Sequence, residues 1–229
     1  MSTVKLQPLL ALGLTILAAS TQAFGGATLD RVEQKKELVG VLMESYPPFS
    51  FLNEQNQLDG FDVDVAKAVA DKLGVKLRLE TPSWDVIAAG RWSGRYDICI
   101  CSMTPSKARA EVFDFPVEYY ASPAVIVVNA NAPYKDLAAL LAAAKAAPKT
   151  INYATFGSGS APHLVGALLE QAADVRLQDV PYRGSAQAMM GLIGGEIQMA
   201  IDTVASAAPH VRSGKLRALA IAGNERARA

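Results

Sequence analysis

Hydrophobic and polar positions alternate along residues 38–222 in a way that predicts strands and helices in turn. The apolar, partly β-branched run Leu38–Met43 has the pattern of a buried strand. Residues 61–73 carry apolar side chains at helical spacing, and Gly74 supplies the stop at the carboxyl end. Residues 75–80 alternate with a period of two, which is typical of a half-buried strand. This part of the chain is therefore expected to form strand, helix and strand.

The same patterns continue along the rest of the chain, with a polar turn at 53–60. Helices are expected at 84–92, from Thr104 as N-cap onward, and at 134–147, 161–172, 185–194 and 204–213; strands are expected at 96–103, 125–128, 151–155, 179–182, 196–201 and 216–222. Strands that alternate with helices imply an α/β fold with parallel sheets flanked by helices. The strand at 125–128 divides the chain into two lobes, and a ligand is expected where their strands end.

An apolar run at Leu9–Ala19 precedes the alternating region. As a helix it spans about 16 Å, well short of the roughly 30 Å hydrocarbon core of a membrane. We therefore expect residues 1–23 to be a secretory signal peptide that is cleaved near Ala23, and an N-terminal membrane anchor is the alternative. The mature protein is then expected to be exported, with lobe one at 24–124 and lobe two at 125–229.

Composition narrows the possible functions of this 229-residue chain. Apolar types make up 51% and charged types 19%, which excludes a disordered tail. Lys and Arg together number 22, as do Asp and Glu, so the basic excess of a nucleic-acid-binding protein is missing. Two Cys and two His leave little room for a structural zinc site, and no cofactor is expected. Cys99 and Cys101 share one face of a predicted strand, about 7 Å apart, so we expect two free thiols rather than a disulfide.

Several side chains at predicted strand ends of the first half suit an anionic ligand. Ser102 and Thr104 bring hydroxyls to a helix start, and Arg109 follows with a guanidinium, an arrangement that a carboxylate needs. Tyr46 and Trp84 follow two other strands and could clamp the ligand's stem. The alternatives are a capped helix with a surface arginine, and aromatic side chains that only pack in the core.

The second half offers a glycine-rich loop at 157–160 between a strand and a helix. Its backbone can bend close to a ligand, and the helix start presents unpaired N–H groups to an anion. Asp202 and Thr203 end a strand and are expected to face the same cleft, or else to cap the following helix. Ser158, His163 and Asp202 supply the residue types of a hydrolase triad, but the loop lacks the nucleophile-elbow and phosphate-loop patterns.

Residues 30–128 resemble the amino-acid-type (family 3) periplasmic binding proteins of ABC importers. The resemblance rests on YPPFSF at 46–51, LDGFDVDVAKAVADKLG at 58–74 and SMTPSKARAEVFDFPVEYY at 102–120. It implies that Arg109 binds the ligand α-carboxylate, that Ser102 and Thr104 bind the carboxylate and α-amino groups, and that Tyr46 and Trp84 stack on the side chain. Met43 stands where many members carry an Asp, which weakens the case for a basic ligand.

From about residue 125 the chain is similar to a second family, the tripartite tricarboxylate transporter receptors, or Bug proteins. This similarity rests on INYATFGSGSAPHLVGALL, VPYRGSAQAMMGLIGGEIQMAIDT and APHVRSGKLRALAI, at 151–169, 180–203 and 208–221. It implies a carboxylate site at the Gly/Ser loop, where the matching positions are Ser158, Gly159, Ser160 and His163, and it places Asp202 and Thr203 near the cleft. Both families share the type 2 two-lobe architecture, and their join near 125–129 indicates a natural or artificial fusion. A return segment to lobe one is expected to be missing, which leaves that lobe incomplete.

The sequence therefore predicts a periplasmic solute-binding receptor that closes about a hinge near 121–131 on a small carboxylate-bearing solute, most of all an amino acid. Its partner is a membrane permease of an importer. One alternative is a di- or tricarboxylate receptor of a tripartite transporter. Another is a dehydratase-like enzyme, for which Glu44 is the nearest candidate acid or base, and a third is a non-functional truncated or fused product.

Overall fold

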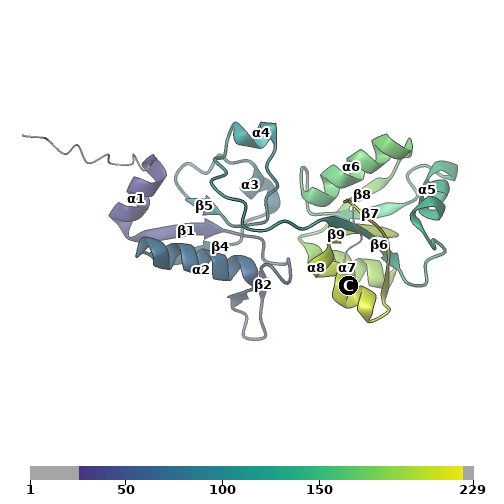
Figure 1. Ribbon diagram of the computed structural model, residues 1–229, viewed down its shortest axis with the longest axis horizontal. Coiled ribbons are helices and arrows are strands. Elements are labelled where there is room, and N and C mark those ends of the chain that lie inside the picture. Colours follow the sequence, from purple (N-terminus) through teal and green to yellow (C-terminus); the bar gives the residue numbers. More distant parts are fainter. Residues whose placement is uncertain (1–25, 224–229) are drawn as a thin grey trace, which may run out of the picture.

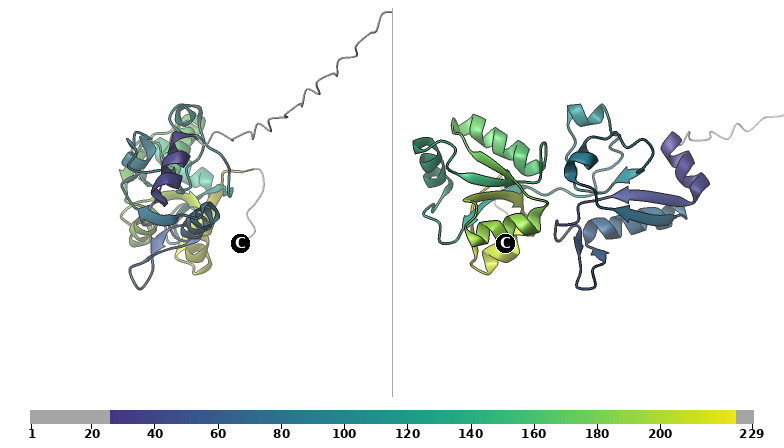
Figure 2. Two further views of the ribbon diagram at one scale, coloured as in Figure 1. Left: turned by 90° about the vertical axis from the view of Figure 1, so that its left-hand side faces the viewer. Right: turned by 180° about the vertical axis from the view of Figure 1, so that it is seen from behind.

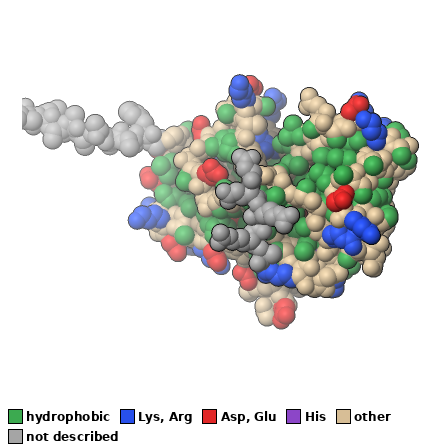
Figure 3. Space-filling view, turned by 45° about the vertical axis from the view of Figure 1, so that its right-hand side comes forward, with side chains coloured by type: hydrophobic (Ala, Val, Ile, Leu, Met, Phe, Trp, Pro, Cys, Tyr) green, Lys and Arg blue, Asp and Glu red, His purple; other side chains and the backbone are tan. Residues whose placement is uncertain are grey.

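The computed structural model describes residues 26–223, which form two lobes joined by one extended linker at residues 113–123 (Figure 1). The two lobes lie side by side along the longest axis of the molecule (Figure 2). The predicted signal peptide at 1–23 lies outside these residues. Within 26–223, no helix is both long and apolar enough to cross a membrane. Basic and acidic side chains are interspersed over the face in Figure 3, as equal numbers of each allow.

Lobe one is built on a parallel three-stranded sheet in the order β4-β1-β5. Its strands are β1 (Glu37–Val41), β4 (Lys76–Glu80) and β5 (Ile98–Cys99), and a short antiparallel hairpin pairs β2 (Phe51–Leu52) with β3 (Leu58–Asp59). Its helices are α1 (Ala27–Lys35), α2 (Phe61–Leu73), α3 (Trp84–Ala88) and α4 (Lys107–Ala110). The hairpin stands where the sequence predicted only a polar turn.

Lobe two carries a five-stranded sheet in the order β10-β6-β9-β7-β8. Its strands are β6 (Ala124–Asn129), β7 (Asn152–Thr155), β8 (Gln178–Pro181), β9 (Met199–Thr203) and β10 (Leu216–Ile221), and its helices are α5 (Leu137–Ala146), α6 (Ala161–Ala173), α7 (Ser185–Gly194) and α8 (Val204–Arg212). This sheet is mixed rather than parallel, because β6 runs antiparallel to both β9 and β10. Ala124 pairs with Thr203, so the chain enters lobe two at the edge where β9 ends.

The pairing of β6 corrects the expected hinge at 121–131. Residues 124–129 are hydrogen-bonded to a strand on each side and are buried over Val125–Val128. Bending there would break both ladders, so movement between the lobes has to come from the linker before Ala124. The helix starting near Thr104 also begins later than expected, because Ser106 caps α4 by accepting a hydrogen bond from the Arg109 N–H.

Cys99 and Cys101 form a disulfide, which corrects the expectation of two free thiols. The predicted strand at 96–103 is shortened to β5, and the chain bends after Cys99. This bend brings the two Cα atoms to 5.4 Å, closer than the roughly 7 Å of an extended strand on which the prediction relied. The next residue, Ser102, has a left-handed φ of 58°.

The disulfide closes a very small loop, so it should stabilise the protein only modestly. By the chain-entropy estimate its loss should lower the free energy of unfolding by about 1.5 kcal/mol, and the midpoint of thermal unfolding by about 3–6 °C. Melting of the Cys99→Ser, Cys101→Ser double variant beside the parent measures this. Alkylation of two thiols in the unfolded parent without reductant would show instead that no disulfide forms.

Candidate functional site

A cavity of about 590 Å³ lies between the lobes, with walls from both lobes and from the linker. Lobe one contributes residues that follow β1 and β5, and lobe two contributes the end of β9 and the start of α6. Among the lining residues are Tyr46, Ser102, Thr104, Tyr119, Tyr120, Ala161, Pro162, Asp202 and Thr203. The cavity therefore lies at the carboxyl ends of strands from both sheets, which is where ligands of α/β folds bind.

Asp202 places a buried carboxylate in the lobe-two wall of this cavity. Its side chain accepts hydrogen bonds from Ser185 Oγ at 2.5 Å and from the Thr203 N–H at 2.7 Å. Asp202 is 4% exposed, and burial raises the pKa of its carboxyl to about 6. Among residues 26–223 no ion pair involves Asp202. Since a buried carboxylate without a cation is unfavourable, this group is suited to bind a positively charged ligand atom.

Tyr46 faces Asp202 from lobe one. Burial first, and then the Asp202 charge, raise the pKa of its hydroxyl well above the ordinary value, so the hydroxyl stays protonated. Its ring lies 5.6 Å from the Phe156 ring of lobe two, between centroids, in an edge-on arrangement. Thr203 has the cap role that the sequence analysis left as an alternative, because its Oγ1 accepts a hydrogen bond from the Ser206 N–H at the start of α8.

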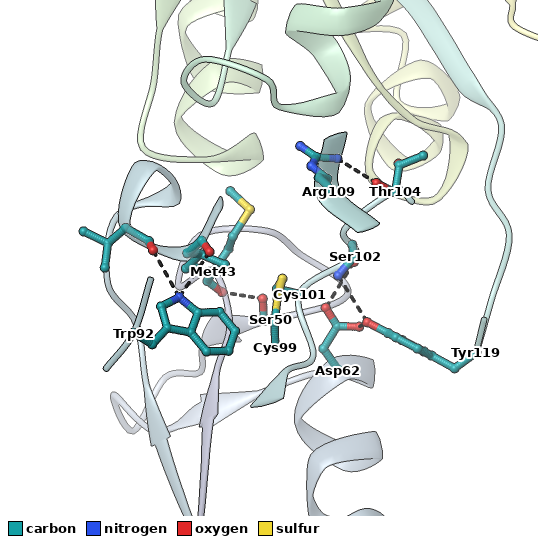
Figure 4. Close-up of a disulfide and its surroundings, with 12 residues drawn as sticks. Met43, Ser50, Asp62, Trp92, Cys99, Cys101, Ser102, Thr104, Arg109 and Tyr119 are labelled. Carbon is teal, nitrogen blue, oxygen red and sulfur yellow. Dashed lines mark hydrogen bonds between the residues drawn. A yellow bond between two sulfur atoms is a disulfide. The ribbon is translucent and has the colours of Figure 1, made fainter. Parts of the chain in front are cut away.

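Arg109 reaches across to lobe two instead of lining the cavity. Its Nη2 donates to the Gly159 carbonyl at 2.5 Å, and its Nη1 donates to the Thr104 carbonyl at 2.7 Å. The guanidinium carbon lies 5.5 Å from the centre of the Trp84 ring, and partial burial lowers the pKa of the guanidinium. Figure 4 shows Arg109 and Thr104 together on the side of lobe one that faces lobe two. Arg109 thus bridges residues that adjoin the cavity on both lobes.

Two of the four amides of the Gly/Ser loop at 157–160 already have hydrogen-bond partners. The Gly159 N–H donates to His163 Nδ1 at 3.3 Å, and the Ser160 N–H donates to the Gly157 carbonyl. Ser160 is buried, and its Oγ accepts from the Phe156 N–H and donates to the Gly157 carbonyl. The loop therefore offers carbonyls rather than amides to lobe one, and the cavity receives only the start of α6.

In the described part of the chain, the residues of the alternative hydrolase triad are not hydrogen-bonded to one another. His163 Nδ1 accepts from Gly159, whereas the Asp202 carboxylate accepts from Ser185 and Thr203. Ser158 is exposed, and its carbonyl accepts a hydrogen bond of 3.1 Å from Trp84 Nε1. These three side chains therefore do not form the hydrogen-bonded chain from nucleophile to base to acid that a hydrolase triad needs.

Trp84 lines a second cavity of about 540 Å³, whose walls also come from both lobes. Glu44, Asp85, Gly157 and Arg183 also line it. The structure thus divides the predicted site residues. Tyr46, Ser102, Thr104, Asp202 and Thr203 line the larger cavity; Trp84 lines the smaller one; and these residues line neither: Arg109, Ser158, Gly159, Ser160 and His163.

The sequence analysis missed residues that support the larger cavity. Asp62 is fully buried and accepts hydrogen bonds from Ser102 Oγ and the Tyr119 hydroxyl, each at 3.1 Å. The Tyr120 hydroxyl donates to Ser102 Oγ at 2.5 Å, and Ser185 holds Asp202. An acidic residue in the first turn of a helix ordinarily indicates favourable helix-dipole interaction, so Asp62 carried no distinguishing signal.

The two lobes pack backbone against backbone at Gly184, just before α7. A Cβ atom there would lie 2.3 Å from the Ser45 carbonyl oxygen of lobe one. The backbone φ of 169° is extended, so an alanine is acceptable within lobe two itself. The Ala186 N–H donates to the Ser45 carbonyl, and Ser206 Oγ donates to the Pro47 carbonyl at 2.7 Å, so the contact also includes hydrogen bonds between lobes.

Gly184→Ala should hold the lobes apart. We expect a larger radius of gyration by small-angle scattering, and an apparent affinity for solute that falls about tenfold for each tenfold loss of the closed population. Gly194→Ala, at the other end of α7, is the matched control, because a Cβ there meets nothing within 4 Å. An unchanged radius of gyration for Gly184→Ala would mean that the Ser45 contact does not limit closure.

Comparisons with known proteins place the two lobes in two families. Residues 38–155 match the bacterial extracellular solute-binding proteins, family 3. Residues 115–229 match the tripartite tricarboxylate transporter family receptors. The two matches overlap across the linker and the start of lobe two, and each covers half of the chain.

Individual relatives follow the same division. A probable amino-acid ABC transporter-binding protein of Haemophilus influenzae is 36% identical over 115 residues, which are 50% of this chain and 45% of that protein. The UPF0065 protein in the tcbD-tcbE intergenic region of a Pseudomonas species is 38% identical over 104 residues, which are 45% of this chain and 31% of that protein. The chain thus spans less than half the length of these curated relatives.

A solved structure covers most of both lobes. The ancestral arginine-binding protein bound to arginine superposes with a TM-score of 0.67 at 26% identity, over 81% of this chain and 79% of that one. The two-lobe α/β architecture predicted from the sequence is therefore confirmed. The chain belongs to the family 3 bacterial extracellular solute-binding proteins through residues 38–155 and to the tripartite tricarboxylate transporter family receptors through residues 115–229.

Proposed function

We propose that this protein is an exported receptor that captures a small carboxylate-bearing solute, an amino acid, for a membrane importer. The observation that carries the proposal is the cavity between the lobes, with the buried Asp202 carboxylate in its wall and Arg109 next to it. In this proposal residues 1–23 are the signal peptide, 24–124 form lobe one and 125–229 form lobe two.

An amino acid supplies charges of both signs to match these groups. Its ammonium group takes the position opposite Asp202, whose carboxylate otherwise lacks a cation. Its carboxylate lies toward Thr104 and the first turn of α6, where Ala161 lines the cavity and amides make no intrahelical bond. A guanidinium binds an ionised carboxylate more strongly than a neutral carbonyl, so the ligand carboxylate replaces Gly159 as the acceptor for Arg109.

Lobe two favours a second candidate, a receptor for di- or tricarboxylates. Its sequence match is to tripartite tricarboxylate transporter receptors, and α6 starts at the cavity. Asp202 argues against this candidate, because its ionised carboxylate repels a polyanion. The names of the lobe-one relatives support the amino acid instead.

Binding rather than catalysis is part of the proposal. Glu44, the nearest candidate acid or base for a dehydratase-like reaction, is exposed, accepts a hydrogen bond from Thr81 Oγ1 and lines the second cavity. The two matching families and the Haemophilus influenzae relative are named as binding proteins or transporter receptors, which supports the same conclusion.

Isothermal titration calorimetry tests the function. The panel consists of L-arginine, L-glutamine, L-cystine, L-glutamate, succinate and citrate at pH 8, where Asp202 is ionised. We expect one-site binding of an amino acid and none of succinate or citrate. Binding of succinate or citrate with no amino acid binding would support the tripartite-type receptor. If no member of the panel binds to a cooperatively folded protein, the proposed function is wrong.

A further inference from the structure

The linker and the wall of the cavity meet at one buried carboxylate. Asp62 lies in the first turn of α2 with no exposed surface. Its Oδ2 accepts from Ser102 Oγ, and its Oδ1 accepts from the hydroxyl of Tyr119 in the linker. Figure 4 shows Asp62 with Ser102 and Tyr119 converging on it, beside the disulfide. Asp62 is not a lining residue of either cavity, so it contacts the binding region only through these partners.

The hydrogen bonds around Asp62 all run in one direction. The Ser102 N–H donates to the Tyr119 hydroxyl at 3.1 Å, and that hydroxyl donates to Asp62. The Tyr120 hydroxyl donates to Ser102 Oγ, which in turn donates to Asp62. Each of these four hydrogens is used once, and both chains of donors end on the carboxylate. The pattern is therefore complete only when Asp62 acts as an acceptor on both oxygens.

This pattern determines what Ser102 can offer to a ligand. A hydroxyl has one hydrogen, and that of Ser102 is committed to Asp62. The group that Ser102 turns toward the cavity is then a lone pair, which accepts a hydrogen bond rather than donating one. An asparagine at position 62 would have one accepting oxygen and one donating NH2 group in place of two accepting oxygens. The NH2 group would face a hydrogen from Ser102 or from Tyr119, so one of these two hydrogen bonds would be lost.

We propose that Asp62 is a positioning residue of the binding cleft: it fixes the direction of the Ser102 hydroxyl hydrogen and, through Tyr119, holds the interlobe linker against the wall of the cavity. The ligand binding part of this inference rests on the proposed function, whereas the linker part does not. Tyr46, Tyr119 and Tyr120 are the titratable neighbours of Asp62, and burial keeps all three hydroxyls protonated by raising their pKa values.

Calorimetry with L-arginine at pH 8 tests the effect on Ser102. Asp62→Asn should weaken binding about tenfold, in line with one hydrogen bond to a charged group. Asp64→Asn is the matched control, because Asp64 lies in the same first turn but is exposed and paired with Lys67. It should bind as the parent does.

A double-mutant cycle distinguishes positioning from general disturbance. If Asp62 acts through Ser102, the Asp62→Asn change should alter affinity less than twofold in a Ser102→Ala background. Equal factors for Asp62→Asn in both backgrounds, or parental affinity of the single variant, would overturn the assignment to Ser102.

Cleavage of the linker gives a readout that needs no solute. A glutamate-specific protease should cut after Glu118, next to Tyr119, severalfold faster in Asp62→Asn than in Asp64→Asn. Equal rates would overturn the role in holding the linker.

If L-arginine does not bind the parent, the double-mutant cycle is repeated with the panel member that binds. If none binds, the proposed function fails and the proteolysis rates alone decide the inference about Asp62.

Discussion

Arg109→Ala should weaken capture of an amino acid by roughly 10- to 100-fold, because a hydrogen bond to a charged group contributes about 1.5–3 kcal/mol. In the structure its guanidinium already bonds across the lobes to the Gly159 carbonyl and lies over the Trp84 ring. The alanine variant therefore loses the anion contact that replaces the bond to Gly159 when the ligand binds. Calorimetry with the amino acid that binds the parent measures the loss of affinity.

Two further variants make the role of Arg109 specific. Arg109→Lys keeps the charge but loses the forked geometry and the flat contact with Trp84, so its affinity should fall between those of the parent and the alanine variant. Lys107→Ala on the same helix removes an exposed charge and should leave affinity unchanged. Parental affinity in Arg109→Ala would show that the carboxylate lies elsewhere, for example at the start of α6 alone.

Asp202→Asn should abolish amino acid binding and at the same time stabilise the free protein at pH 8 by about 1–3 kcal/mol. Burial raises the pKa of the Asp202 carboxyl from 3.8 to about 6, a difference equivalent to at most about 3 kcal/mol. The asparagine keeps an acceptor for the Thr203 N–H and a donor for Ser185 Oγ. The ligand ammonium group loses its negatively charged partner, so binding is weakened. The free protein no longer buries an ionised carboxylate, so folding is favoured.

The pH dependence of stability gives the sign of this effect. Because the folded state holds the proton more tightly, the contribution of Asp202 to stability is full below pH 4 and is lost as the pH rises through about 6. The variant and the parent should therefore melt alike at pH 4 and diverge by pH 8. Burial likewise raises the pKa of Asp62 to about 6, so the difference between variant and parent is the diagnostic quantity.

Asp179→Asn provides the control for Asp202, since Asp179 is exposed on β8. It should change neither melting nor affinity. A parent and an Asp202→Asn variant that melt alike at pH 8 would show that Asp202 is not ionised and buried in the free protein.

The sequence predicts an element of the fold well where residues within that element determine its bounds, and less well where distant parts of the chain do. The predicted helix at 61–73 has the bounds observed for α2, because Gly74 adopts a left-handed conformation and its N–H bonds to Ala70 and Asp71 carbonyls. Strand β5 is shorter than predicted, because the disulfide bends the chain at Cys101. The antiparallel course of β6 depends on where the linker enters lobe two, which periodicity does not encode.

The candidate site was predictable in part for a similar reason. Residues at strand ends, such as Tyr46, Ser102 and Asp202, were predictable because strand ends of both sheets meet at the cleft. The hydrogen-bond partners of the Gly/Ser loop were not, because they depend on how the loop folds: the Gly159 N–H bonds to His163, and the Ser160 N–H bonds to Gly157. Asp62 was missed because its partners lie in the linker and after β5, far from it in sequence.

Residues of both lobes belong to one buried apolar cluster, including Tyr46, Trp84, Phe156 and Met189. Separating the lobes far enough to admit a solute exposes part of that surface to water, and hydration of apolar surface raises the heat capacity. Entry of a solute by way of an open state should therefore have an enthalpy of activation that increases with temperature, while the net heat-capacity change of binding remains small because the closed packing is restored.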